Sequence, residues 1–315
     1  MRVRIGWGLL LCPLLAWAGA AFAQPATGQH MTPAQELGRQ IFFDGSLSEP
    51  AGQSCASCHA PQAAFASPGG AILEGTVTGR FGNRTPPTIA YAADFKMAFA
   101  EPLDCKTNGV QRILQALSAY EGGPEVNPFS SKYDGALAGK VQLTAQEVRG
   151  YQLFQGEAKC EKCHPSSPGP RGEPPLFTDF GYDNIGAPKN PKNPFYAQPK
   201  DFNPDGAAYI DGGLGAFLKK PAEYGKFRSP SLRNITVNEE TRAYMHNGSL
   251  IGLKEVLAFY NKRDAEPGRW APEVAATVNK DDLGDLKLSD QDIEDLLAFL
   301  RTLTDGYKPS VTTAR

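Results

Sequence analysis

Apolar residues recur at helical spacing in five stretches of the chain, and these stretches predict its regular structure. In 253–260 they occupy positions i, i+3, i+4 and i+7 of one helix face. Three other helices are expected to start at a capping box, in which a hydroxyl residue and a polar residue three positions later each accept a hydrogen bond from the other's backbone N–H. The three pairs are Thr32 with Gln35, Thr144 with Glu147, and Ser289 with Asp292. The fifth predicted helix covers 108–121.

Two of these helices have a clear apolar face. The face of 108–121 contains Val110, Ile113, Leu114 and Leu117. The helix after Ser289 is expected to bury five residues of the core: Ile293, Leu296, Leu297, Leu300 and Leu303.

The segments between the helices are long and rich in proline and glycine, of which the chain has 26 and 33. We expect 127–140 to be a loop or linker. The segment 165–211 should be a long loop, and its many aromatic residues argue against disorder. The expected fold class is therefore mainly α, with long loops.

A five-residue pattern, C-x-x-C-H, occurs twice. The first copy contains Cys55, Cys58 and His59. The second copy contains Cys160, Cys163 and His164. This pattern attaches haem c, because two thiols at this spacing bond to the two vinyl groups of one porphyrin. The adjacent histidine then supplies an axial ligand to the iron.

A zinc site and a redox C-x-x-C pair are the alternatives for these cysteines. Neither explains why a histidine directly follows each pair, so we predict two covalently bound haems c. Each motif follows a helix with a capped start, so the halves resemble repeats of one cytochrome c module. We expect a haem domain at 24–135 and a second haem domain at 136–315.

The first 23 residues have the features of a secretory signal. Arg2 and Arg4 precede an apolar stretch, and the residues Ala21, Phe22 and Ala23 form a small-residue cleavage site. No later stretch is long and apolar enough to span a membrane. We expect a periplasmic protein with no membrane span. Its mature net charge of −4 does not suggest binding to nucleic acid.

Few residues remain as further axial ligands. Beyond the motif histidines, the mature chain has two histidines and three methionines: His30, His246, Met31, Met97 and Met245. No histidine lies between the two motifs, so we expect the first haem to keep an open position, with Met97 as the alternative ligand. Cys105 is left over and is given no function.

Three longer runs extend the argument. The run LGRQIFFDGSLS at 37–48, the run 131–164 and the run 227–260 resemble the bacterial dihaem cytochrome c peroxidase and MauG family. The resemblance implies that the N-terminal haem reduces hydrogen peroxide and that the C-terminal haem relays electrons. It also implies a far ligand for the C-terminal haem fourteen residues after His246, which is Tyr260; Met245 is the rival ligand. His246 itself is expected to form hydrogen bonds around the site.

The sequence also departs from this family. Its Phe-Trp-Asp-Gly-Arg run and its Asn-Pro-x-Glu-Met run are absent, and Trp270 is the one tryptophan of the mature chain. Glu101, Glu121 and Glu125 are the nearest acids to the missing runs. A calcium ion is implied by the resemblance, although Thr85 replaces the asparagine of the family.

Two hypotheses follow. The first is an exported enzyme that reduces peroxide. Its electrons come from a small cytochrome c or cupredoxin, or from a protein substrate that becomes oxidised. This enzyme could form a homodimer. The alternative is a non-catalytic dihaem electron-transfer cytochrome that has lost its peroxide pocket.

Overall fold

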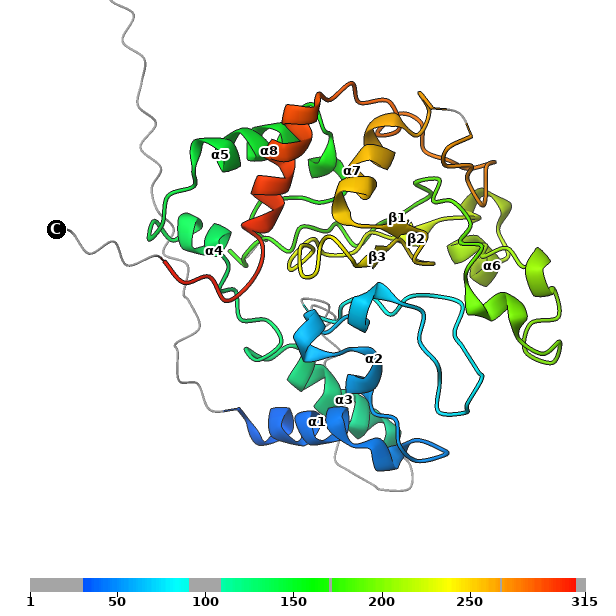
Figure 1. The fold of residues 1–315 in the computed structure, drawn as a ribbon. Helices are drawn as coiled ribbons and strands as arrows, with labels where there is room; N and C mark the ends of the chain where they lie inside the picture. Colours follow the sequence, from blue (N-terminus) through cyan, green and yellow to red (C-terminus); the bar gives the residue numbers. More distant parts are fainter. Residues whose placement is uncertain (1–30, 91–108, 170–171, 267, 310–315) are drawn as a thin grey trace, which may run out of the picture.

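The computed structural model describes residues 31–90, 109–169, 172–266 and 268–309. The predictions for the signal segment 1–23, and those for His30, Met97, Glu101 and Cys105, lie outside these residues. The fold is rich in helices and has few, short strands, as predicted (Figure 1). The helices are α1 (Pro33–Phe43), α2 (Cys55–Cys58), α3 (Gly109–Glu121), α4 (Lys132–Leu137), α5 (Ala145–Gln155), α6 (Gly213–Leu218), α7 (Leu253–Lys262) and α8 (Asp290–Arg301).

Helices α1 and α3 pack closely against each other near the N-terminus (Figure 1). The predicted cap of α1 is present, since Gln35 N donates to Thr32 Oγ1 at 3.3 Å and the Gln35 side chain accepts from Thr32 N at 2.8 Å. A Cβ atom on Gly38 would lie 1.9 Å from the Ala116 carbonyl oxygen, so only glycine permits this approach. Phe42 and Tyr120 form the buried centre of this pair.

Helices α5 and α8 form a second close pair, which builds the larger core (Figure 1). Gly150 permits the contact, because a Cβ atom there would lie 1.9 Å from the Asp295 carbonyl oxygen. Arg149 Nε lies 2.8 Å from Asp295 Oδ2 across the same pair. The five apolar residues predicted to face inward from α8 are all buried.

Four two-residue strands pair in two small antiparallel sheets. β1 (Tyr182–Asp183) pairs with β2 (Phe227–Arg228), and β3 (Ala243–Tyr244) pairs with β4 (Leu250–Ile251). Figure 1 shows β1, β2 and β3 between α7 and the part of the chain that contains α2. These strands hold the long loops of the C-terminal half in place.

Two predictions of local structure were wrong. The expected linker 127–140 contains helix α4, which begins because the Ser131 and Asp134 side chains cap each other. Asp134 is buried and receives two hydrogen bonds from Arg233, at 3.0 and 2.9 Å, which compensate its charge. On α3, Ile113 and Leu114 are 41% and 49% exposed, because the face that contains Ala116 meets α1 instead.

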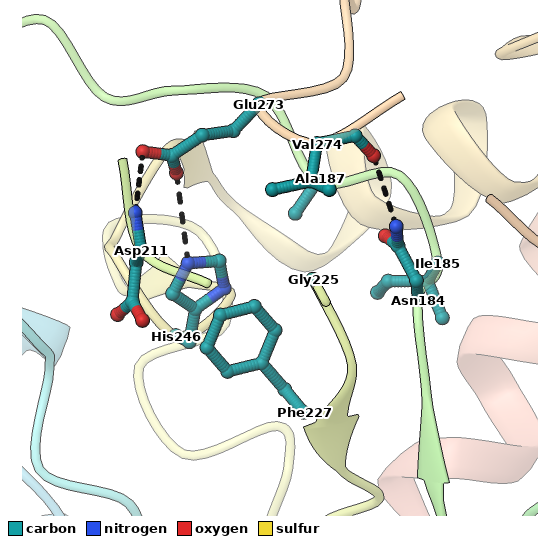
Figure 2. A pocket seen from close by; sticks show the side chains of 9 residues that line it. All are labelled: Asn184, Ile185, Ala187, Asp211, Gly225, Phe227, His246, Glu273 and Val274. Atoms are coloured by element: carbon teal, nitrogen blue, oxygen red, sulfur yellow. Dashed lines mark hydrogen bonds and ion pairs between the residues drawn. The ribbon is translucent and has the colours of Figure 1, made fainter. Parts of the chain in front are cut away.

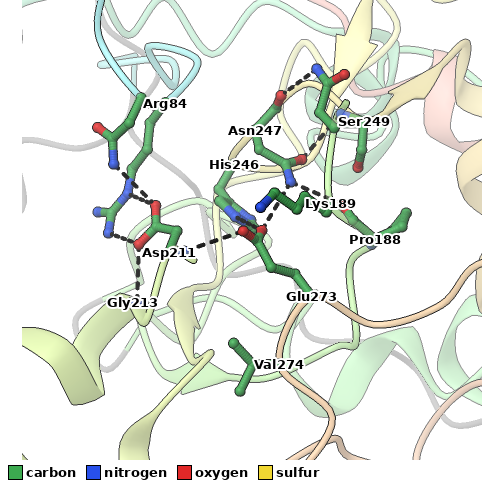
Figure 3. Close-up of polar contacts among 12 residues, drawn as sticks. Arg84, Pro188, Lys189, Asp211, Gly213, His246, Asn247, Ser249, Glu273 and Val274 are labelled. Carbon is green, nitrogen blue, oxygen red and sulfur yellow. Dashed lines mark hydrogen bonds and ion pairs between the residues drawn. The ribbon is translucent and has the colours of Figure 1, made fainter. Parts of the chain in front are cut away.

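The segment 83–87 ties the N-terminal part of the chain to the C-terminal part. Arg84 donates to both carboxylate oxygens of Asp211, at 2.6 and 2.7 Å (Figure 3). Thr85 N donates to the His246 carbonyl oxygen at 2.8 Å. The Asn193 side chain donates to the Asn83 carbonyl oxygen at 3.0 Å. Side-chain and backbone bonds thus fix the two parts against each other.

Burial opposes ionisation of Asp211, but the hydrogen bonds and the charge of Arg84 outweigh it, so the pKa of Asp211 lies below its usual value. The ionised carboxylate therefore stabilises the folded state above the pKa that Asp211 has in the unfolded chain. This contribution is lost as the pH falls through the lower pKa of the folded state.

We predict that Arg84→Gln lowers the free energy of unfolding at pH 7 by about 1–2 kcal/mol, at the low end for hydrogen bonds to a charged group because the Arg84 side chain is 47% exposed and solvent screens its charge. The difference from the wild type should shrink below about pH 4, as Asp211 becomes protonated. Denaturant unfolding of the haem-loaded protein at several pH values measures it. The control, Lys254→Gln, breaks a solvent-exposed pair with Glu294 and should cost less than about 1 kcal/mol. An equal loss for Arg84→Gln at every pH would contradict the account.

Candidate haem-binding sites

The first motif forms one helical turn followed by a fixed imidazole. Cys55 and Cys58 begin and end α2, and His59 N donates to the Cys55 carbonyl oxygen at 2.9 Å. His59 Nδ1 lies 3.0 Å from the Pro87 carbonyl oxygen and 3.3 Å from that of Phe65. Carbonyl oxygens only accept, so Nδ1 carries the proton and Nε2 keeps a free lone pair.

The second motif repeats this arrangement. Cys160 opens a single 3₁₀ turn, and His164 N donates to its carbonyl oxygen at 2.9 Å. His164 Nδ1 lies 2.8 Å from the Phe177 carbonyl oxygen. Burial lowers the pKa of His164, which favours the neutral imidazole that acts as a metal ligand.

The residues of both motifs fit a covalently attached haem. None of the four motif cysteines forms a disulfide bond. Burial raises the pKa of each thiol, that of Cys160 to about 12, so the thiols are protonated at neutral pH. Each pair lies on one turn beside an imidazole whose Nε2 is available to iron. The structure thus gives both motifs one donor set, two thiols and one imidazole nitrogen.

The two candidates for the far ligand of the second haem, Tyr260 and Met245, lie at the same apolar cluster. Tyr260, on α7, is partly buried; burial first, and the nearby thiols of Cys160 and Cys163 second, raise its pKa well above the usual range. Met245 packs against the same apolar cluster as Tyr260. The effect of the two thiols on the pKa links Tyr260 to the second motif.

His246 lies where the two parts of the chain meet, and Figure 2 shows the pocket around it. Its ring stacks on Phe227, with centroids 3.6 Å apart and planes inclined by 11°. Its Nε2 is buried 3.8 Å from Glu273 Oε2 and has no hydrogen-bond partner among the described residues. Glu273 also accepts from Asp211 N at 3.2 Å and from the Asn247 side chain at 3.4 Å.

The acids near the first motif differ in their surroundings. Glu125 pairs with Arg39 at 3.1 Å and accepts from the Tyr120 hydroxyl, so it serves the packing of α1 on α3. Glu121, at the end of α3, lies close enough to Cys55 for its charge to raise the pKa of that thiol. Burial raises the pKa of Glu121 itself. The sequence pointed to Glu121 only as one of the three acids nearest to the missing runs.

The residue expected near calcium has another partner. Thr85 Oγ1 donates to the Gly70 carbonyl oxygen at 3.2 Å. Within the described ranges, no three histidine, cysteine or acidic side chains gather as a metal site. The same residues include no helix that is long and apolar enough to cross a membrane.

Three comparisons with known proteins agree. The family model described as "Di-haem cytochrome c peroxidase" matches residues 32–101. The chain is 31% identical to the methylamine utilization protein MauG of Paracoccus denitrificans, over 96% of this chain and 98% of the relative. It is 28% identical to the cytochrome-c peroxidase IdrP1 of Denitromonas iodatirespirans, over 85% of this chain and 80% of the relative.

Solved structures extend the likeness to the fold. The dihaem peroxidase BthA of Burkholderia thailandensis superimposes with a TM-score of 0.67 at 30% identity, over 88% of this chain and 87% of BthA. A MauG-like protein associated with microbial copper homeostasis superimposes with a TM-score of 0.64 at 30% identity, over 90% of this chain and 92% of its own. The chain therefore belongs to the MauG and dihaem cytochrome c peroxidase family, and it is a peroxidase-like oxidoreductase with two haem groups.

Proposed function

We propose that this protein reduces hydrogen peroxide at a first haem c held by Cys55, Cys58 and His59. The second haem c is bound by Cys160, Cys163 and His164 and relays electrons. The observation that carries the proposal is the shared geometry of the two histidines, each with Nδ1 on a backbone carbonyl and Nε2 free. Each haem belongs to its own domain, the first to 24–135 and the second to 136–315. When bound, the haems would provide the iron at which peroxide binds and the centres that exchange electrons.

The first haem would keep an open position. His59 is the one histidine in the described part of its half, and its Nε2 serves the near side of the iron. Met31 packs against the cluster formed by Phe42 and Tyr120, so its thioether is engaged in the core of α1 and α3. Glu121 is a candidate for moving protons near this haem, because burial raises its pKa and favours the protonated form.

Tyr260 would close the second haem. The effect of the Cys160 and Cys163 thiols on its pKa, which links Tyr260 to the second motif, supports this role. Iron binding would have to displace the phenol proton, which burial holds in place. A closed haem exchanges electrons and does not bind peroxide. His246 orients the neighbouring segment through its carbonyl bond with Thr85 and its stacking on Phe227.

The electrons come from a small cytochrome c or cupredoxin, or from a protein substrate that becomes oxidised. Both kinds of donor are kept because the relatives named above include MauG as well as a cytochrome-c peroxidase. Export to the periplasm stays a prediction from the first 23 residues. Calcium stays a prediction from the family resemblance, and backbone carbonyl oxygens near Thr85 are ligands that Ca²⁺ accepts.

EPR of the ferric, haem-loaded protein before and after one equivalent of peroxide tests the proposal. We expect one high-spin signal from the open first haem and one low-spin signal from the closed second haem. Both signals should decrease when peroxide is added. Two low-spin signals that peroxide leaves unchanged would instead support the electron-transfer cytochrome as the function.

A substitution at the far ligand tests the role of Tyr260. Because thioether ligation raises the potential of a haem, Tyr260→Met should raise the midpoint potential of the low-spin haem. The shift should be on the order of 0.1 V, within the range of about 0.8 V over which axial ligands act. Spectroelectrochemical titration measures it. Met245→Leu is the matched control and should leave the potential unchanged; a shift for Met245→Leu alone would identify Met245 as the ligand.

A further inference from the structure

Two tyrosine hydroxyls form a hydrogen-bonded pair inside the core next to the second motif. Tyr133 is only 3% exposed, and its hydroxyl donates to that of Tyr151 at 3.3 Å. The Tyr151 hydroxyl lies 3.0 Å from Ser166 Oγ and accepts from the Gln155 side chain at 2.9 Å. A core built only for packing would place phenylalanine here, as it does at Phe154 and Phe299 in the same cluster.

This pair is joined to the second motif by two routes. Ser166 follows His164 by two residues, and its backbone N donates to Glu161 Oε1, inside the motif, at 3.0 Å. The Tyr133 ring packs edge-on against Phe177, with centroids 5.2 Å apart. The Phe177 carbonyl oxygen is the group that holds the His164 imidazole, at 2.8 Å.

We propose that Tyr133 and Tyr151 are a redox-active pair that supplies electrons for peroxide reduction when no external donor is bound. Each tyrosine gives up one electron and its hydroxyl proton and becomes a neutral tyrosyl radical. Hydrogen peroxide accepts the two electrons and two protons, its O–O bond breaks, and two molecules of water form. An external reductant later returns one electron and one proton to each tyrosine.

The surroundings of the pair favour this chemistry. Burial first, and the bond with Tyr151 second, raise the pKa of Tyr133, so oxidation must remove a proton together with the electron. The hydroxyls of Tyr151 and Ser166 connect Tyr133 to the edge of the core, where the exposed Gln155 donates to both of them, so the proton has only a short distance to travel to solvent.

Charges of both signs act on Tyr133. Glu161, whose Oε2 is buried and has no hydrogen-bond partner among the described residues, raises the pKa of Tyr133 and favours the loss of an electron. Arg233 acts in the opposite direction, and its two bonds to Asp134 offset part of its charge.

The inference rests on the proposed function, because peroxide must first react with the haem-loaded protein. The experiment therefore treats that protein with peroxide without a donor, and follows the haem absorption spectrum and freeze-quenched EPR. We expect an organic radical signal that narrows when the protein is made with ring-deuterated tyrosine. The Tyr133→Phe/Tyr151→Phe double variant should lose this signal and still show the absorption change. Tyr224→Phe, at an exposed tyrosine far from the motif in the chain, should keep the signal.

The outcomes separate the two ideas. If the absorption spectrum responds to peroxide but the radical signal does not narrow with deuterated tyrosine, or persists in the double variant, the tyrosine pair is excluded and the proposed function stands. Narrowing with deuterated tryptophan instead would assign the radical to Trp270. If peroxide leaves the absorption spectrum unchanged, the proposed function fails, and the role of the tyrosine pair fails with it.

Discussion

The hydrogen bond from each motif histidine to a backbone carbonyl is the interaction on which the rest of this structure depends. Two cysteines and a histidine in sequence do not by themselves aim an imidazole. The Pro87 and Phe177 carbonyl oxygens fix the Nδ1 proton of His59 and His164, so that Nε2 is the available ligand on both sides. Each carbonyl belongs to a long loop, which explains why a helix-rich protein keeps so much irregular chain close to its two sites.

The loop that holds His59 also connects the first site to the C-terminal half of the chain. Pro87 holds His59, and two residues earlier Thr85 bonds to the carbonyl oxygen of His246. Arg84 secures this segment on Asp211, and Figure 3 shows how the bonds continue through Glu273 and Asn247. A displacement at one motif histidine is thereby coupled to the segment that contains Met245 and leads to Tyr260. Such a continuous bonded path suits a protein in which two redox centres act in one reaction.

Local chemical patterns made part of this structure predictable. The caps of α1, α5 and α8, the inward face of α8 and the two haem motifs depend on residues close in sequence, and the family followed from longer runs. The start of α4 at Ser131 was missed although its Ser-x-x-Asp cap is of the same kind as that of α8, because a helix of six residues is too short to show a repeated apolar pattern. The exposed face of α3 and the Tyr133–Tyr151 pair depend on which helix packs against which, and a single sequence does not contain that information.

The number of haems bound covalently to one chain tests the central claim most directly. Mass spectrometry of the intact protein under denaturing conditions measures it, because denaturation removes any haem that is not bonded to cysteine. The account predicts a mass equal to that of the processed chain plus two haems. A mass that corresponds to one haem or to none would contradict the equivalence of the two motifs, and with it the division of roles between an open and a closed haem.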